Sequence, residues 1–216
     1  MKLIGIDEAG RGCVIGPMAV AIVSIVPAKS DTLKNLGIKD SKLIAPKKRY
    51  DFVKIIKGIA FNNEVRLIDP RIIDNYREKN HLNLLEAEVC ASLIQRVSSE
   101  KDTIYIDAPG KHGTKFSKQI HNILKNKYNI IAENKADLNY PVVAAASILA
   151  KVSRDNAIEQ LKKKFGDFGS GYPSDKKTVN FLANFYKKNK TFPDCVRKSW
   201  ATLNKIVYGE QKEFLF

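Results

Sequence analysis

Near its start the chain carries the stretch Leu3-Ile-Gly-Ile-Asp-Glu-Ala-Gly-Arg-Gly12, on which the interpretation of the whole sequence depends. The apolar run Leu3–Ile6 is typical of a buried strand, and it ends in two adjacent carboxylates, Asp7 and Glu8. Like charges at short range repel and resist burial, and a cation beside them removes that objection. Glycine on both sides of Arg11 frees the backbone, and the arginine fork suits phosphate. The stretch therefore predicts a metal site beside a phosphate-bearing ligand.

The rest of the chain has the pattern of an α/β protein. Runs rich in Ile and Val predict strands over residues 3–6, 18–26, 63–68, 103–106 and 129–132. Apolar residues at three- and four-residue steps predict helices over 46–57, 84–97, 116–124, 141–164, 176–188 and 200–207. Strands that come first and then alternate with helices indicate a mixed sheet with helices packed on it. At 216 residues we expect one domain over 1–216, with a C-terminal helical subdomain over about 166–216.

Composition narrows the class of partner. The formal net charge of +14 suits a polyanion, with nucleic acid ahead of an anionic membrane surface, although a lysine-rich solvated surface is the alternative. The three cysteines are far apart and fit neither a disulfide framework nor a zinc site. The N-terminus is no signal peptide, and no apolar run approaches the roughly 20 residues that span a bilayer. We expect a cytoplasmic monomer with no membrane contact.

Two further acids repeat the pattern of the first strand. Asp107 ends the run Ile104–Ile106, and Asp137 lies between a predicted strand and the helix that Pro141 opens. Carboxyl ends of parallel strands gather ligand-binding groups, and carboxylate oxygens suit Mg²⁺ or Mn²⁺. The alternative makes these aspartates ordinary turn residues at strand ends. Because neighbouring strand residues point to opposite faces, Asp7 and Glu8 can reach one metal pair only if the strand breaks or twists at Glu8.

Two other segments are candidates for substrate handling. Lys39-Asp-Ser-Lys42 offers two cations and a hydroxyl, and its alternative is a solvated loop. Gly169-Ser-Gly-Tyr-Pro-Ser-Asp175 places Tyr172 in a glycine-rich loop, where an aromatic ring can stack on a base or sugar. The alternative is a plain helix start with Ser174 as the N-cap.

Taken in order, these segments resemble ribonuclease HII, the type 2 ribonuclease H family, in the form of its archaeal branch. The resemblance runs from residue 1 to about 205. The motifs that carry it are Ile6-Asp-Glu-Ala-Gly-Arg-Gly12, Lys39-Asp-Ser-Lys42, Tyr105-Ile-Asp-Ala-Pro109, Lys135-Ala-Asp137, Tyr140-Pro-Val-Val-Ala-Ala-Ala-Ser-Ile-Leu-Ala-Lys-Val-Ser-Arg-Asp155, Gly171-Tyr-Pro173 and Val196-Arg-Lys-Ser-Trp200.

The resemblance implies a ribonuclease H-like fold, with a five-stranded mixed sheet flanked by helices and a C-terminal helical extension. It implies an endoribonuclease that cleaves RNA in RNA–DNA duplexes, including single ribonucleotides in DNA, with two Mg²⁺ or Mn²⁺ ions and 3′-hydroxyl and 5′-phosphate products. The implied metal-binding and catalytic acids are Asp7, Glu8, Asp107 and Asp137. The implied substrate-binding residues are Gly10, Arg11, Gly12, Lys39, Ser41, Lys42 and Tyr172.

Two positions depart from the family's pattern without replacing a metal ligand. Cys13 stands where proline is common, and Asn134 stands where a histidine often occurs. Two rival functions are a non-catalytic nucleic-acid binder with the same basic surface and another nuclease or transferase of the same fold.

The last residues of the sequence suggest a partner. Gln211-Lys-Glu-Phe-Leu-Phe216 resembles a truncated sliding-clamp peptide, with an apolar residue three places after the glutamine and a terminal aromatic. Residues 209–216 are a candidate clamp-binding tail, although the paired aromatics usual in such peptides are missing, and a frayed apolar tail is the alternative.

Overall fold

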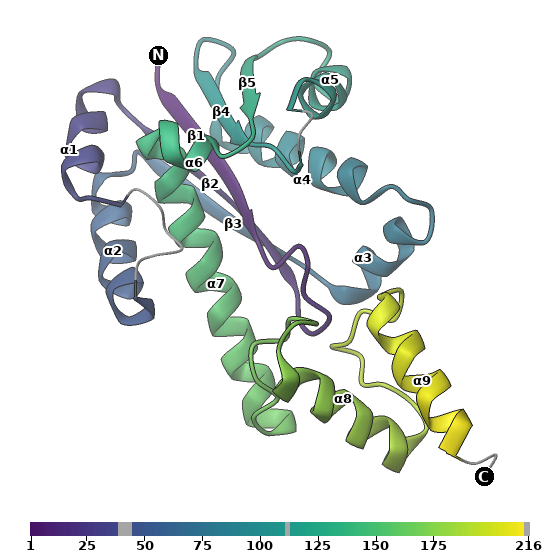
Figure 1. Ribbon diagram of the computed structural model, residues 1–216. Coiled ribbons are helices and arrows are strands. Elements are labelled where there is room, and N and C mark those ends of the chain that lie inside the picture. The colour runs from purple at the N-terminus through teal and green to yellow at the C-terminus, as the bar shows by residue number, and fades with distance from the viewer. Residues whose placement is uncertain (39–44, 111–112, 214–216) are drawn as a thin grey trace. The chain divides into compact units, whose positions relative to one another are not determined.

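The computed structural model describes residues 1–38, 45–110 and 113–213 (Figure 1), which fall into two units. Unit 1 comprises Met1–Ala9, Ala19–Leu67 and Leu82–Ser153. Unit 2 comprises Gly10–Met18, Ile68–His81 and Arg154–Phe216.

A five-stranded sheet organises unit 1. Its strands are β1 (Leu3–Ala9), β2 (Met18–Ile25), β3 (Asn62–Ile68), β4 (Thr103–Asp107) and β5 (Asn129–Glu133), in the order β3-β2-β1-β4-β5. Strand β1 pairs antiparallel with β2 and parallel with β4, and β4 pairs parallel with β5. The predicted mixed sheet is confirmed, and its parallel half brings the carboxyl ends of β1, β4 and β5 to one edge.

Helices cover both faces of this sheet (Figure 1). The helices of unit 1 are α1 (Ser30–Asn35), α2 (Pro46–Ile59), α4 (Leu82–Val97), α5 (Gly113–Ile123), α6 (Ala136–Asn139) and the first part of α7 (Pro141–Phe165). On one face, Ala21 and Val23 of β2 pack in a core cluster with α1, α2 and small residues of α7 such as Ala145. A Cβ atom added at Gly5 would lie 2.3 Å from the carbonyl carbon of Val142, so β1 and α7 approach each other through glycine.

Unit 2 is helical and contains α3 (Pro70–Arg77), α8 (Lys176–Asn189) and α9 (Ala201–Glu213). An isolated antiparallel bridge joins Ile15 to Val196 and ties the segment after β1 to the chain before α9. Helices α1, α3 and α6 were not predicted because each has eight residues or fewer, which is too short for a periodic apolar pattern. Within the described residues, no helix combines the length and the apolar character that crossing a bilayer requires.

Candidate active site

The register of the parallel strands places Asp7 beside Asp107. The pairing of β1 with β4 runs through Ile6 and Ile106, so the next residues on the two strands are these aspartates. In-register neighbours in a parallel pair point to the same face of the sheet. Asp7 is only 4% exposed, which shows that its carboxylate lies in a largely desolvated position.

The strand does not break at Glu8, so that half of the prediction is wrong, and a twist at Glu8 stays a prediction. Pairing with β2 continues through Glu8–Val20 and Ala9–Ala19, because the antiparallel ladder extends to the last residue of β1. The side chains therefore keep the alternation of a regular strand. Asp7 interacts with Ser147 and Lys151 of α7, whereas the charge of Glu8 is felt by Cys90 of α4.

Asp107 also fixes the segment that carries Asp137. An Asp107 carboxylate oxygen (Oδ1) accepts a hydrogen bond from the Ala136 amide at 2.9 Å, so the end of β4 is bonded to the first turn of α6. Lys135 precedes this turn in the left-handed conformation, with φ 60°. Asp137 is the second residue of α6 and is 8% exposed. The loop after β5 thus brings a third buried or half-buried acid to the edge of the sheet.

Electrostatics at this edge favour a cation. Burial raises the pKa of Asp7 well above its usual value, and the negative charges of Glu8 and Asp107 raise it further. Lys151 and a hydrogen bond from Ser147 act in the opposite direction. Lys151 in turn donates to the Ser147 hydroxyl, so these two residues, one turn apart on α7, form a polar pair facing Asp7.

The donor set fits a hard divalent ion. Carboxylate oxygens are the ligands that Mg²⁺ and Mn²⁺ prefer, and a dication would relieve the repulsion that burdens Asp7. Among the residues that the structure describes, no three His, Cys, Asp or Glu side chains already form a metal site. Asp7 and Asp107 end two paired strands, and Glu8 and Asp137 are the other two predicted ligands.

A small cavity adjoins the acids on the α4 side of the sheet. It has a volume of about 10 Å³, and its polar lining residues are Asp7, Glu8, Glu86 and Asp107. Glu86 is 3% exposed on α4 and was not singled out from the sequence. The signal was present, because Glu86 occupies the apolar stripe of that helix one turn before Cys90, where a carboxylate is unusual. Asp137 does not line this cavity.

Two of the predicted substrate-binding segments, the Gly10–Gly12 turn and the Tyr172 loop, are joined within unit 2. The amides of Val14 and Ile15 both donate to the Gly171 carbonyl, at 2.8 and 3.1 Å, so the chain after the Gly10–Gly12 turn lies against the Tyr172 loop. Cys13 is buried and hydrogen-bonds the Tyr172 hydroxyl, and burial together with this neighbour raises the pKa of Tyr172 to about 12. The phenol therefore stays neutral at physiological pH.

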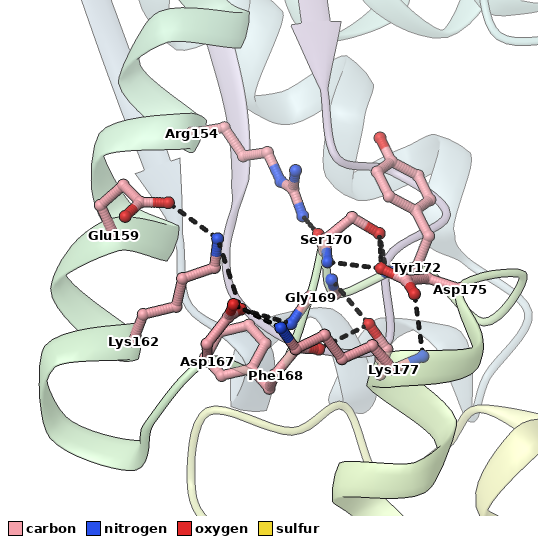
Figure 2. Close-up of polar contacts among 12 residues, drawn as sticks. Arg154, Glu159, Lys162, Asp167, Phe168, Gly169, Ser170, Tyr172, Asp175 and Lys177 are labelled. Carbon is pink, nitrogen blue, oxygen red and sulfur yellow. Dashed lines mark hydrogen bonds and ion pairs between the residues drawn. The ribbon is translucent and has the colours of Figure 1, made fainter.

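Arg154 supports the same loop (Figure 2). One of its terminal nitrogens (Nη2) donates to the Ser170 carbonyl at 2.6 Å, and its guanidinium carbon lies 5.0 Å from the centroid of the Tyr172 ring. Tyr172 itself is exposed, with 37% of its surface accessible. The N-cap of α8 is Asp175, whose carboxylate accepts from the Lys177 amide, and not Ser174, which the alternative to a stacking role for Tyr172 had placed there.

Of the other positions singled out from the sequence, the structure describes Asn134 but not the Lys39–Lys42 segment. Lys39, Ser41 and Lys42 lie outside the described residues. Asn134 donates to the Gly110 carbonyl at 3.0 Å, so it joins the loops after β4 and β5.

Comparisons with known proteins agree over nearly the whole chain. A family model for ribonuclease HII matches residues 4–203. Ribonuclease HII of Pyrococcus furiosus is 46% identical over 206 residues, which cover 95% of this chain and 91% of that protein. The crystal structure of ribonuclease H2 from Pyrococcus horikoshii superposes with a TM-score of 0.88 at 40% identity, covering 98% of this chain and 100% of the other. The ribonuclease HII of a PCNA complex from Archaeoglobus fulgidus superposes with a TM-score of 0.84 at 40% identity, covering 93% and 95%.

Proposed function

The chain belongs to the ribonuclease HII family, and we propose that it hydrolyses the RNA strand of RNA–DNA duplexes, including a single ribonucleotide embedded in DNA. It is a ribonuclease H of type 2, an endoribonuclease. The expected products carry 3′-hydroxyl and 5′-phosphate ends. The observation that carries the proposal is the pair Asp7 and Asp107 at adjacent strand ends, where burial and like charge raise the pKa of Asp7.

The four acids Asp7, Glu8, Asp107 and Asp137 are the proposed ligands of two Mg²⁺ or Mn²⁺ ions. Divalent ions held by these acids would make water a nucleophile at neutral pH and would stabilise the charge on the leaving oxygen. Asp7 lies beside Asp107 and receives the Ser147 hydrogen bond, which keeps its carboxylate oriented. Lys151, on helix α7, offsets part of the negative charge of these acids.

A second set of residues, separate from the four acids, is proposed to recognise the substrate. Backbone groups of Gly10, Arg11 and Gly12 are proposed to contact the ribose 2′-hydroxyl and the scissile phosphate, since the 2′-hydroxyl is what distinguishes RNA from DNA. Tyr172, exposed and braced by Arg154, is proposed to stack at the junction between ribonucleotide and deoxyribonucleotide. The proposed phosphate contacts of Lys39, Ser41 and Lys42 complete this set.

The substitution Asp107→Asn tests the catalytic proposal. The amide oxygen keeps the bond to the Ala136 amide, so the fold is retained while a charged ligand is lost. We expect kcat to fall by about 10²- to 10³-fold on duplex DNA with one ribonucleotide. A gel assay of the nicked strand in Mg²⁺ and in Mn²⁺ measures this, and chelation should abolish cleavage reversibly.

Glu100→Gln is the matched control, because Glu100 is an exposed acid of unit 1, with 64% of its side chain accessible. Full activity of the Asp107→Asn variant would contradict the assignment of Asp107 as a catalytic metal ligand. Binding without cleavage by the unmodified chain, at any concentration of either ion, would favour the rival non-catalytic binder.

We also propose that residues Gln211–Phe216 bind a sliding clamp. Support comes from the peptide-like spacing of these residues and from the relative solved in complex with PCNA. The proposed location is the cytoplasm, since the three cysteines are free and buried, as in a reducing compartment. A monomer is the proposed assembly state.

A further inference from the structure

A buried arginine holds the Gly10–Gly12 turn from within unit 2. The side chain of Arg197 is fully buried, at 0% exposure. Its guanidinium donates to three backbone carbonyls, those of Gly16 at 3.1 Å, Arg11 at 2.7 Å and Gly10 at 2.7 Å. Burial lowers the pKa of Arg197 to about 10, so the group remains charged at neutral pH. A desolvated cation directed at backbone carbonyls makes short, charge-assisted hydrogen bonds.

Trp200 completes the contact with the turn. Its indole nitrogen donates to the Gly12 carbonyl at 3.3 Å, so each of the three turn carbonyls accepts from a side chain of the segment 197–200. The ring of Trp200 also lies against two guanidinium groups, with centroid distances of 5.0 Å to Arg197 and 4.5 Å to Arg77. Cation–π contacts of this kind hold the ring in place.

Helix α3 fixes the segment that carries both side chains. The buried carboxylate of Asp74 accepts from the Lys198 amide at 2.7 Å and from the Ser199 amide at 3.0 Å, and it also accepts from the Ser199 hydroxyl. Arg77, one turn later on α3, donates to the Ser199 carbonyl. The segment is therefore held at four points, which leaves little freedom to the groups that contact the turn.

The hydrogen bonds that hold the carbonyls of Gly10 and Arg11 also set the direction of the amide N–H groups in this turn. In a trans peptide the C=O of one residue and the N–H of the next point in opposite directions, and the described residues contain no cis peptide. With the carbonyls of Gly10 and Arg11 drawn toward Arg197, the amides of Arg11 and Gly12 face away from it. A Cβ atom added at Gly12 would have no atom within 4 Å, so this end of the turn has open space for a ligand.

We propose that Arg197 and Trp200 are positioning residues that orient the peptide N–H groups of the Gly10–Gly12 turn and thereby set the preference for ribose over deoxyribose. The inference rests on the proposed function, in which this turn contacts the 2′-hydroxyl. A merely structural anchor would affect all substrates equally, whereas a positioning anchor changes the ratio between two sugars.

The test measures binding and not turnover. Two duplexes, identical except for one ribonucleotide, are titrated by fluorescence anisotropy against the chain carrying Asp107→Asn, which slows cleavage, and a gel of each titrated sample checks that the duplex is intact. Trp200→Phe removes one N–H donor and keeps the ring, and Arg197→Lys keeps the charge and loses the fork. Arg71→Lys is the matched control, because Arg71 is an exposed arginine of unit 2 that pairs with Asp194 at 2.7 Å.

We expect Trp200→Phe to lower the ribose-to-deoxyribose affinity ratio about three- to tenfold, the usual effect of one hydrogen bond. Arg197→Lys should lower it further, Arg71→Lys should leave it unchanged, and the affinity for the all-DNA duplex should change little. An unchanged ratio, or equal losses on both duplexes, would overturn the proposal.

Two controls separate the possible failures. If Arg197→Lys shows no cooperative thermal unfolding, Trp200→Phe alone decides the outcome. If the unmodified chain neither cleaves nor prefers the ribonucleotide duplex, the proposed function fails and the inference fails with it. If the unmodified chain does both and the variants keep the full preference, only the positioning role is wrong.

Discussion

Asp175 is the residue that joins the Tyr172 loop to helix α8. Its carboxylate accepts from the Ser170 amide at 2.7 Å, from the Ser170 hydroxyl at 2.8 Å and from the Lys177 amide at 2.9 Å (Figure 2). These hydrogen bonds, led by that of the Ser170 amide, lower the pKa of Asp175 to about 2. Asp175 therefore caps helix α8 and also fixes the loop that carries Tyr172, a proposed substrate-binding residue.

This depressed pKa predicts how loop stability depends on pH. The group titrates near 4 when unfolded and near 2 when folded, so its stabilising contribution is complete above pH 4 and is lost as pH falls toward 2. We expect Asp175→Ala to lower the unfolding free energy at pH 6, with a difference from the unmodified chain that shrinks as the pH falls from 4 toward 2. Urea unfolding of both chains across this range measures the difference.

Asp194→Ala is the control for that experiment, because Asp194 is an exposed acid of unit 2 whose carboxylate pairs with Arg71 on the surface. A difference for Asp175→Ala that stayed constant from pH 6 to pH 2 would show that the carboxylate's charge is not what holds the loop.

At the scale of elements, the approach of β1 to α7 is what places Asp7 near Ser147 and Lys151. Gly5 makes that approach feasible, because its missing Cβ would lie 2.3 Å from both the carbonyl carbon and the oxygen of Val142. These are backbone atoms at the start of a helix and cannot rotate aside. A side chain at position 5 must therefore push strand and helix apart.

We expect Gly5→Ala to lower the unfolding free energy by about 1–3 kcal/mol, as overpacking of a core does. The displaced helix should also reduce cleavage, since Ser147 and Lys151 move with it. Gly58→Ala is the matched control: Gly58 lies in α2 with open space around its Cβ position, and alanine should leave stability equal or raise it by up to about 1 kcal/mol. Equal effects of the two substitutions in urea unfolding would contradict this account.

Sequence patterns predicted the long helices but missed the short ones, and the reasons are physical. Long periodic segments such as Leu82–Val97 and Pro141–Phe165 were predicted within a few residues of their ends. The four-residue helix Ala136–Asn139 has no periodicity to detect, and only the bond from its first amide to Asp107 reveals its role. The expected break at Glu8 failed because it was argued from ligand geometry alone, whereas the pairing of β2 with β1 governs the strand.

At the scale of the whole molecule, a chain with a formal net charge of +14 keeps a small acidic edge. The excess of cations favours a polyanionic partner, and the acids at the ends of β1 and β4 repel that partner unless a cation intervenes. The proposal that a metal ion binds together with nucleic acid reconciles these two features.

The clamp proposal also belongs to this scale, because it concerns an assembly. Deleting Lys212–Phe216 should weaken binding to a clamp of the PCNA type at least about tenfold, as measured by surface plasmon resonance with immobilised clamp. Cleavage of a short duplex should be unaffected, since no proposed site residue is removed. Lys212→Ala, which keeps Gln211 and both phenylalanines, is the matched control and should bind normally. Unchanged affinity after the deletion would eliminate the proposal.

The sequence by itself determined the α/β class, the strand-end acids Asp7 and Asp107, and the family, because apolar runs, charges and motif order are local properties of the chain. Only the tertiary structure decided which side chains hydrogen-bond to the Gly10–Gly12 turn. Arg197 and Trp200 hold the carbonyls of a turn more than 180 residues away in the sequence, as the separations of 187 and 188 residues show. Such hydrogen bonds depend on where the fold brings distant backbone groups, and no local spacing encodes them.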